Sequence, residues 1–145
     1  MVDFEFSLEK VLRVRAIRED KAQNQYLQAR REKREVENQL QQASGKQEQL
    51  YNFLRKNDLS LEEKVQARNY MLSHREKINR IQEKLFSKKE KLNKKKDEMI
   101  KKRKKKEVLE NLKEKEYERF YNNLLYKEQK QIDEIAGRAG SGSEI

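Results

Sequence analysis

Residues 56–64 have the sequence KNDLSLEEK, and this short stretch separates two long segments that both carry a helical pattern. Asn57 and Asp58 favour a turn, because their side chains form hydrogen bonds with nearby backbone groups. Ser60 and Glu63 match the capping box, in which two side chains satisfy backbone N–H groups at the start of a helix. The stretch therefore predicts that one helix ends before it and that a second begins near Ser60.

The segment before the turn repeats apolar residues with a period of 3.5, which is typical of a coiled coil. Ten of the fourteen residues on its expected contact seam are apolar. The fourteen seam residues are Leu8, Leu12, Arg15, Glu19, Ala22, Tyr26, Ala29, Lys33, Val36, Leu40, Ala43, Gln47, Leu50 and Leu54. We expect a helix over about residues 7–56, with Ser7 as its N-cap. Gly45 is expected to be a tolerated weak point, costing about 1 kcal/mol relative to alanine, rather than a hinge.

The segment after the turn continues the same alternation of four-residue and three-residue spacings. Its seam is Ala67, Met71, His74, Ile78, Ile81, Leu85, Lys88, Leu92, Lys95, Met99, Lys102, Lys106 and Leu109. We expect a helix over about residues 60–136. Two helices joined by a turn at residues 57–60 fold back on each other. The predicted fold is therefore all-α, a long antiparallel two-helix coiled coil in which residue i faces roughly residue 116 − i.

The second helix is longer than the first, so its C-terminal part is expected to overhang the hairpin. Aromatic and apolar residues are frequent there: Tyr117, Phe120, Tyr121, Leu124, Leu125, Tyr126, Ile132 and Ile135. An exposed apolar surface of this kind is typical of a binding site for a partner or for a second copy of the chain. We expect residues 1–136 to form a single coiled-coil domain and residues 137–145, which contain three of the four glycines, to be disordered.

The composition excludes several functional classes. Charged residues make up 43% of the 145 residues, and proline and cysteine are absent, which favours long exposed helices and excludes disulfides and thiolate metal sites. His74 is the single histidine and is expected to pack in the seam. The sequence shows no phosphate-binding loop, transmembrane run or signal peptide. We therefore expect a cytoplasmic protein with no enzymatic activity, no catalytic residues, and no cofactor or metal.

Most of the excess positive charge lies in one run, residues 88–106, which carries +9 of the net +10. The structural interpretation is a solvated helix face, in which the aliphatic parts of the lysine side chains cover the seam. The functional interpretation is a basic docking surface for an acidic protein partner, made by Lys101, Lys102, Arg103, Lys104, Lys105 and Lys106. Specific nucleic-acid binding is less favoured, because no aromatic residues are interleaved with the lysines. The run is expected to face another basic segment, which predicts a less stable base of the hairpin.

Aromatic residues also gather near the turn. Tyr51, Phe53 and Tyr70 do not belong to the seam, so they are expected to be partly exposed, whereas the neighbouring Met71 does belong to it. They form either a local cap on the hairpin or a second binding site with aromatic anchors.

Both ends of the chain resemble the FliJ family of flagellar export proteins. The N-terminal pattern is Phe4-x-Phe6-x-Leu8-Glu9-Lys10-Val11-Leu12-x-x-Arg15, and the C-terminal pattern is Gln129-Lys130-x-x-Asp133-Glu134-x-Ala136-x-Arg138. The resemblance implies a non-enzymatic stalk of the flagellar type III export apparatus, similar to the central γ subunit of rotary ATPases. It implies three partners: the hexameric export ATPase, the cytoplasmic domain of the membrane export gate, and export chaperones. The protein would then lie at the cytoplasmic face of the membrane.

The resemblance also assigns residues to these contacts. The matching positions for the ATPase ring are Phe4, Phe6, Leu12, Arg15, Asp133, Glu134 and Arg138. For the export gate we nominate Tyr51, Phe53, Tyr70 and Met71. Three alternatives stay open on sequence alone: the equivalent stalk of a virulence type III secretion system, a basic nucleic-acid-binding coiled coil, and a spacer that associates weakly with itself.

Overall fold

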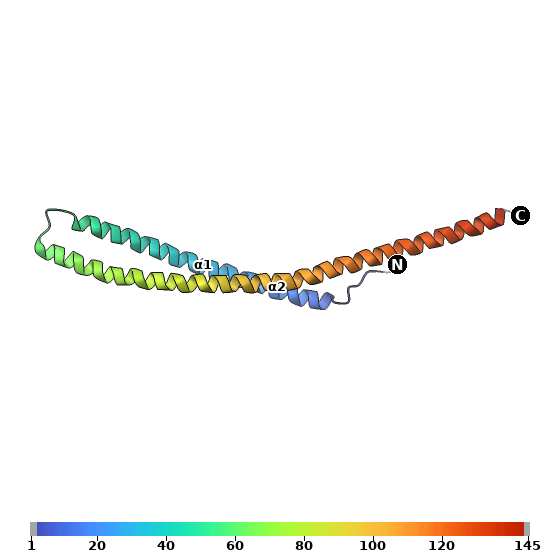
Figure 1. The fold of residues 1–145 in the computed structure, drawn as a ribbon, viewed down its shortest axis with the longest axis horizontal. Coiled ribbons are helices and arrows are strands. Elements are labelled where there is room, and N and C mark those ends of the chain that lie inside the picture. The colour runs from blue at the N-terminus through green and yellow to red at the C-terminus, as the bar shows by residue number, and fades with distance from the viewer. Residues whose placement is uncertain (1–2, 144–145) are drawn as a thin grey trace. The chain divides into compact units, whose positions relative to one another are not determined.

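The computed structural model describes the backbone of residues 3–143 and the side chains of residues 3–140. Within these residues the chain forms two helices and no strand: α1 spans Glu9–Leu54 and α2 spans Leu61–Ser143 (Figure 1). The helices pack against each other in opposite directions, as the contacts below show. This confirms the predicted all-α hairpin of the coiled-coil type.

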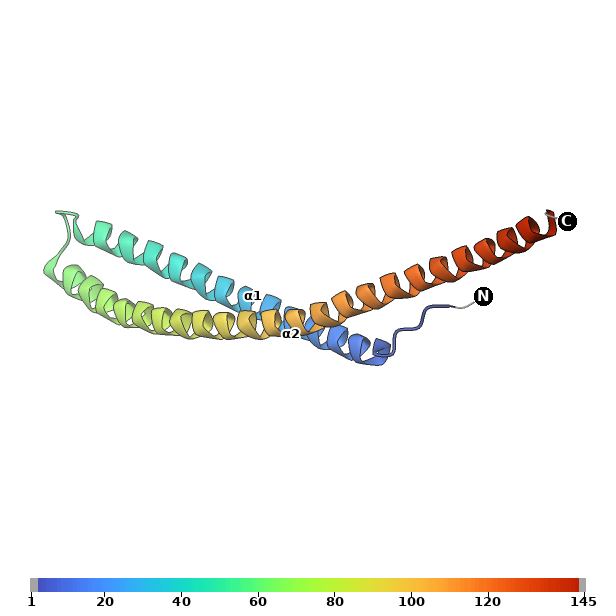
Figure 2. The ribbon, with the colours of Figure 1, turned by 45° about the vertical axis from the view of Figure 1, so that its right-hand side comes forward.

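The contacts divide the chain into two compact units, and the single domain expected over residues 1–136 stays a prediction. We call Met1–Glu19 with Lys101–Ile145 the terminal unit, and Asp20–Ile100 the turn unit. Each unit contains a stretch of α1 and a stretch of α2, and Figure 2 shows the two stretches of the turn unit side by side. A helix pair divides in this way because each helical turn touches only the turns beside it.

The connection between the helices follows from the turn sequence. The Glu63 N–H donates a hydrogen bond to Ser60 Oγ at 3.2 Å, and the Lys64 N–H donates to the Ser60 carbonyl at 3.0 Å. Ser60 is therefore the N-cap of α2, as the capping-box pattern predicted. At the other side, α1 ends at Leu54, two residues before the expected boundary at residue 56.

The start of α1 differs slightly from the prediction. The Glu9 N–H donates to the Phe6 carbonyl at 3.1 Å, which forms a turn, and the Leu12 N–H donates to the Leu8 carbonyl at 2.9 Å. The helix thus begins at Glu9, and Leu8 rather than Ser7 occupies the capping position. The expectation for Ser7 was wrong because the preceding turn shifts the first helical hydrogen bond by one residue.

The predicted seam is confirmed at nearly every position. Leu8 is the exception, with 37% of its surface exposed. All the other seam residues of α1 and α2 are buried or half-buried, including the charged ones. Helix α1 also runs without interruption through Gly45, in accord with a tolerated weak point. Burial every 3.5 residues therefore decides which face of each helix meets the other.

The pairing between the helices is shifted from the one expected. Glu32 was expected to face about residue 84, whereas it contacts Lys88 and Lys91. Likewise His74 contacts Gln47 rather than a residue near 42. The residues of α2 that face a given position of α1 therefore lie about one helical turn or more closer to the C-terminus than expected. It arises because the first turn of α2 extends past the end of α1, a feature that the position of the turn sequence does not reveal.

The C-terminal end also differs from the expectation. Helix α2 continues through Gly137 and Gly140 to Ser143, where the sequence predicted disorder from residue 137. Glycine lowers helix propensity by about 1 kcal/mol per residue but does not remove a backbone hydrogen bond as proline does. The remainder of the expected tail, residues 144–145, lies outside the described residues.

Candidate functional site

The N-terminal segment of the chain packs into the terminal unit. Phe6, Leu12 and Leu109 are each at most 9% exposed and form a buried cluster, against which Phe4 packs. The Phe4 ring also lies 5.3 Å from the Tyr117 ring, edge to face, a favoured geometry for aromatic pairs. Three residues assigned to the ATPase ring therefore pack inside the unit or against it.

Phe4 makes a second ring contact, 5.6 Å from Phe120. Sequence reasoning listed Tyr117 and Phe120 as members of an unpartnered overhang, but the N-terminal segment covers part of this region. The seam of α2 accordingly continues beyond Leu109 through half-buried residues to Phe120. The signal that could have revealed this was the unbroken 4-3-4 spacing from Leu109 through Lys113 and Glu116 to Phe120.

Glu19 holds the basic run of α2 in place. It is 7% exposed; its Oε1 accepts from Arg103 Nε at 3.4 Å, and its Oε2 lies 3.5 Å from Lys106 Nζ. Two of the six residues of the basic docking surface, Arg103 and Lys106, therefore share one carboxylate of α1. Like charges do meet at this end of the hairpin, but a buried carboxylate bridges them, and this contact opposes the repulsion expected from the sequence.

The remaining residues of the basic docking surface differ in accessibility. Lys101, Lys104 and Lys105 are exposed, whereas Lys102 is half-buried on the seam. Arg15, assigned to the ring, lies beside this run and donates from Nη1 to the Lys105 carbonyl at 2.9 Å. Its guanidinium group is therefore fixed against the backbone of α2.

The C-terminal part of α2 carries the other residues assigned to the ring. Asp133, Glu134 and Arg138 are exposed, and Asp133 Oδ1 accepts a hydrogen bond from Gln129 Nε2 at 3.1 Å. Asp133 lies thirteen residues beyond Phe120, or roughly 20 Å along the helix axis. The structure therefore does not bring these three residues together with Phe4, Phe6, Leu12 and Arg15.

Near the turn, the four residues nominated for the export gate lie in three different places. Phe53 and Tyr70 line a groove of about 420 Å³ between α1 and α2. Its other lining residues are Lys46, Gln49, Leu50, Glu63, Gln66 and Ala67. Tyr51 belongs to another face, where its hydroxyl accepts a hydrogen bond from Arg75 at 2.9 Å, and Met71 is half-buried in the seam.

The lining of the groove carries one positive and one negative side chain, Lys46 and Glu63. The Lys46 ammonium lies 5.5 Å above the centre of the Tyr70 ring, a distance that permits a cation–π interaction. Phe53 and Tyr70 are 38% and 46% exposed, so both rings are accessible. The groove thus offers accessible aromatic walls beside a lysine and a glutamate, which suits an apolar anchor flanked by polar groups.

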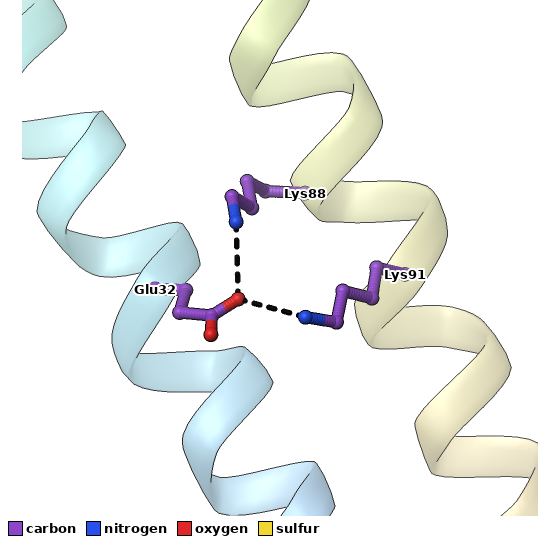
Figure 3. A network of polar contacts seen from close by, with 3 residues as sticks. All are labelled: Glu32, Lys88 and Lys91. Atoms are coloured by element: carbon purple, nitrogen blue, oxygen red, sulfur yellow. Dashed lines mark hydrogen bonds and ion pairs between the residues drawn. The ribbon is translucent and has the colours of Figure 1, made fainter.

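The turn unit also contains a polar cluster that sequence reasoning missed. Glu32 Oε2 lies 3.1 Å from both Lys88 Nζ and Lys91 Nζ, so one carboxylate of α1 joins two lysines of α2 (Figure 3). Hydrogen bonds from Lys91 and then Lys88 lower the pKa of Glu32 to about 2. The cluster was missed because the expected pairing placed Glu32 about one turn away from these lysines.

A second polar pair lies in the seam itself. His74 is 5% exposed, and its Nδ1 donates to Gln47 Oε1 at 2.8 Å, since an amide oxygen can only accept. The buried Nε2 has no hydrogen-bond partner within the described chain. Burial, followed by the charges of Lys46 and Lys77, lowers the pKa of His74 from 6.5, because a protonated ring would be charged in a desolvated site.

The part of the chain that the structure describes contains no group of three or more acidic or histidine side chains placed to hold a metal ion. Neither helix, over the residues searched, has a stretch long and apolar enough to cross a membrane.

Comparison with known proteins identifies the family. The family model described as Flagellar FliJ protein matches residues 4–144, nearly the whole chain. The chain belongs to the FliJ family. This FliJ-family protein matches no curated protein in sequence.

A solved structure shares its fold: a putative YscO homolog, CT670, from Chlamydia trachomatis, with a TM-score of 0.66. The two sequences are 18% identical, and the match covers 92% of this chain and 93% of the other. At that identity the likeness concerns the fold alone. The family match is the finding that supports a role in type III protein export.

Proposed function

We propose that this FliJ-family protein is a non-enzymatic stalk of the flagellar type III export apparatus. In this proposal the terminal unit binds the ring of the hexameric export ATPase, and the turn unit contacts the cytoplasmic domain of the membrane export gate. The protein also engages export chaperones, and it lies at the cytoplasmic face of the membrane through these partners. The observation that carries the proposal is the family match over residues 4–144.

Near the C-terminal end of α2, exposed apolar residues form a stripe on a different face of the helix from the seam that packs against α1. This position supports a binding partner other than α1. Continuing the seam beyond Phe120 in steps of three and four leads to polar residues: Asn123, Lys127, Lys130 and Glu134. The exposed apolar residues lie one or two positions further on, or at least roughly 100° around the helix. They include Tyr117, Tyr121, Leu125, Ile132 and Ile135, which are between 45% and 65% exposed.

This stripe changes the set of residues that we assign to the ATPase ring. Phe6 and Leu12 contribute by holding the terminal unit together, since both are buried. Direct contact falls to the exposed apolar stripe and to Asp133, Glu134 and Arg138. The exposed lysines of the basic docking surface, Lys101 and Lys104 among them, assist by attracting acidic partner surfaces.

The test is stimulation of a hexameric flagellar export ATPase by the purified protein, with co-elution at moderate salt. Tyr121→Ser with Leu125→Ser should reduce both by about tenfold, since exposed apolar anchors dominate interface energies. Phe86→Ser is the matched control, because Phe86 is 65% exposed on α2 in the turn unit. The proposal fails if the unaltered protein neither stimulates nor co-elutes, or if the control loses as much as the double variant.

Contact with the gate has its own test. Phe53→Ala with Tyr70→Ala removes both rings from the groove of the turn unit and should weaken binding to the gate's cytoplasmic domain. ATPase stimulation should be unchanged in this variant. A variant that lost stimulation while keeping gate binding would reverse the assignment of the two ends.

The stalk of a virulence type III secretion system is the second candidate, favoured by the shared fold with the putative YscO homolog. Deletion of the gene in the native bacterium distinguishes the two roles. Loss of flagellar filaments with effector secretion intact supports the flagellar role. The opposite pattern supports the virulence role.

A further inference from the structure

A small groove in the terminal unit is lined entirely by cations. Its lining residues are Arg15 and Arg18 from α1 and Lys102 and Lys105 from α2, around a space of about 120 Å³. No carboxylate belongs to this lining. Four like charges around one small space repel each other, so the groove favours an anion that neutralises more than one of them.

Among the described residues, the neighbouring carboxylates on the same helices do not neutralise these four cations. At helical spacings of three and four residues, the acidic neighbours are Glu19, beside Arg15, and Glu98, beside Lys102. Glu19 is engaged by Arg103 and Lys106, and Glu98 by Lys95. Arg18 and Lys105 have no acidic residue at these spacings. The excess charge in the groove is therefore not balanced locally.

One of the arginines is already oriented. Arg15 is half-buried, and its Nη1 donates to the Lys105 carbonyl at 2.9 Å, which leaves its other N–H groups for a ligand. A planar guanidinium held in this way suits a tetrahedral oxyanion, which can accept two parallel hydrogen bonds. The conformational entropy of this side chain is therefore already reduced before any ligand binds.

The groove lacks what other anionic partners need. No aromatic side chain lines it, so it offers no platform for stacking nucleic-acid bases. It also has no leucine, phenylalanine or tyrosine wall, whereas protein interfaces centre on buried apolar anchors. The small volume and the concentrated charge favour a compact, multiply charged ligand over a broad acidic surface.

We propose that this groove binds a small anion with two or more phosphate groups, such as pyrophosphate or the polyphosphate chain of a nucleotide. Arg15 and Arg18 hold phosphate oxygens from α1, and Lys102 and Lys105 hold them from α2. Bound in this way, the anion joins the two helices of the terminal unit. The inference does not depend on the proposed function, because it concerns the isolated chain.

The test is isothermal titration calorimetry of the full chain with inorganic pyrophosphate, at a salt concentration of about 150 mM to screen diffuse attraction. We expect saturable binding with one anion per chain. Arg18→Gln with Lys105→Gln should weaken it at least about tenfold, since charge-assisted hydrogen bonds are lost. Both side chains are exposed, so the double variant should fold, which circular dichroism checks.

The matched control is Arg31→Gln with Lys89→Gln, which removes the same charge from exposed positions on the same two helices in the turn unit. Pyrophosphate affinity should change less than about twofold, because screening weakens charges beyond the Debye length. Arg18→Lys keeps the charge but removes the planar fork, and should weaken binding about threefold. Equal losses in the two double variants would show diffuse attraction and overturn the proposal.

Further ligands distinguish the sources of the anion. Equal affinity for pyrophosphate and a nucleoside diphosphate shows that only the phosphates are recognised, whereas tighter nucleotide binding identifies a nucleotide; both support a phosphate site. Tighter binding of hexaglutamate than of pyrophosphate would overturn the proposal in favour of an acidic protein partner. The absence of saturable pyrophosphate binding would overturn it outright.

Discussion

The terminal unit and the turn unit are built on the same seam, yet they bury different residues. The terminal unit buries Phe6, Leu12 and Leu109, with Phe4 packed against them. The turn unit buries mostly small residues: Ala22, Ala29, Val36, Ala43 and Ala67, with Met99 the largest apolar member. Polar side chains then join its helices, through Glu32 with two lysines and through His74 with Gln47.

The difference concerns what each unit gains from burial. Hydrophobic stabilisation scales with apolar area removed from water, so a few large side chains can hold the terminal unit. Alanine allows two helices to approach closely but buries little area, so these positions of the turn unit contribute less hydrophobic stabilisation. Polar side chains join the helices in both units, but Glu32 and His74, whose pKa values are lowered in the folded chain, lie in the turn unit. The terminal unit should therefore respond most to loss of apolar volume, and the turn unit most to pH.

The largest effect is expected from Phe6→Ala. Removing a buried phenylalanine costs about 3 kcal/mol or more, through lost burial and the cavity left behind. Chemical denaturation followed by circular dichroism measures the change in the free energy of unfolding. Phe86→Ala is the control, since that ring is 65% exposed, and it should change stability by less than about 0.5 kcal/mol. Similar losses in the two variants would contradict the terminal unit's dependence on its apolar cluster.

A second effect is expected in acid, at Glu32. Because Lys91 and Lys88 lower its pKa in the folded chain from 4.5 to about 2, the unfolded chain takes up a proton first as the pH falls. The stabilisation is present in full above about pH 4.5 and is lost as the pH falls toward 2. Unfolding measured across this range should show a weaker pH dependence in Glu32→Gln.

Glu37→Gln is the matched control for Glu32, because Glu37 pairs with a single lysine, Lys33, at 3.3 Å on its own helix. This variant should keep the acid dependence of the unaltered chain. An unchanged acid dependence in Glu32→Gln would show that the cluster in Figure 3 contributes nothing to the stability of the turn unit.

A smaller effect at milder pH is expected from His74. Its pKa is lowered in the folded chain, so the unfolded chain binds the proton more readily. Stability should be constant above the ordinary value of 6.5 and should fall as the pH drops below it. His74→Gln should remove this slope, and NMR titration of the ring should give a pKa below 6.5. A measured pKa at or above 6.5 would refute the prediction.

The smallest effect is a gain. A Cβ at Gly45 would meet no atom within 4 Å, so alanine fits there without strain. Gly45→Ala should stabilise the turn unit by about 0.5–1 kcal/mol, because alanine restricts the unfolded chain and favours the helix. Thermal unfolding measures the gain. A loss of stability would instead show that α1 needs a flexible point at residue 45.

The seam and the cap of α2 were predictable because both depend on local rules. Alternating spacings of three and four residues place a stripe on one face of a helix, and Ser60 with Glu63 specifies a helix start wherever the helix packs. The pairing of Glu32 with Lys88 and Lys91 was not predictable. A seam that repeats every seven residues fits its partner in several registers, and sequence alone does not choose among them.

By itself, the sequence determined two long helices, the turn between them, the face that each helix buries and the resemblance to the FliJ family. Only the tertiary structure decided the register between the helices, the packing of Phe4 and Phe6, and the bridge from Glu19 to the basic run. It alone assembled the four cations of the small groove from both helices. The physical reason is that helix formation and periodicity arise within short stretches of chain. Each of these contacts instead joins residues more than eighty positions apart, or depends on which turns of the two helices meet.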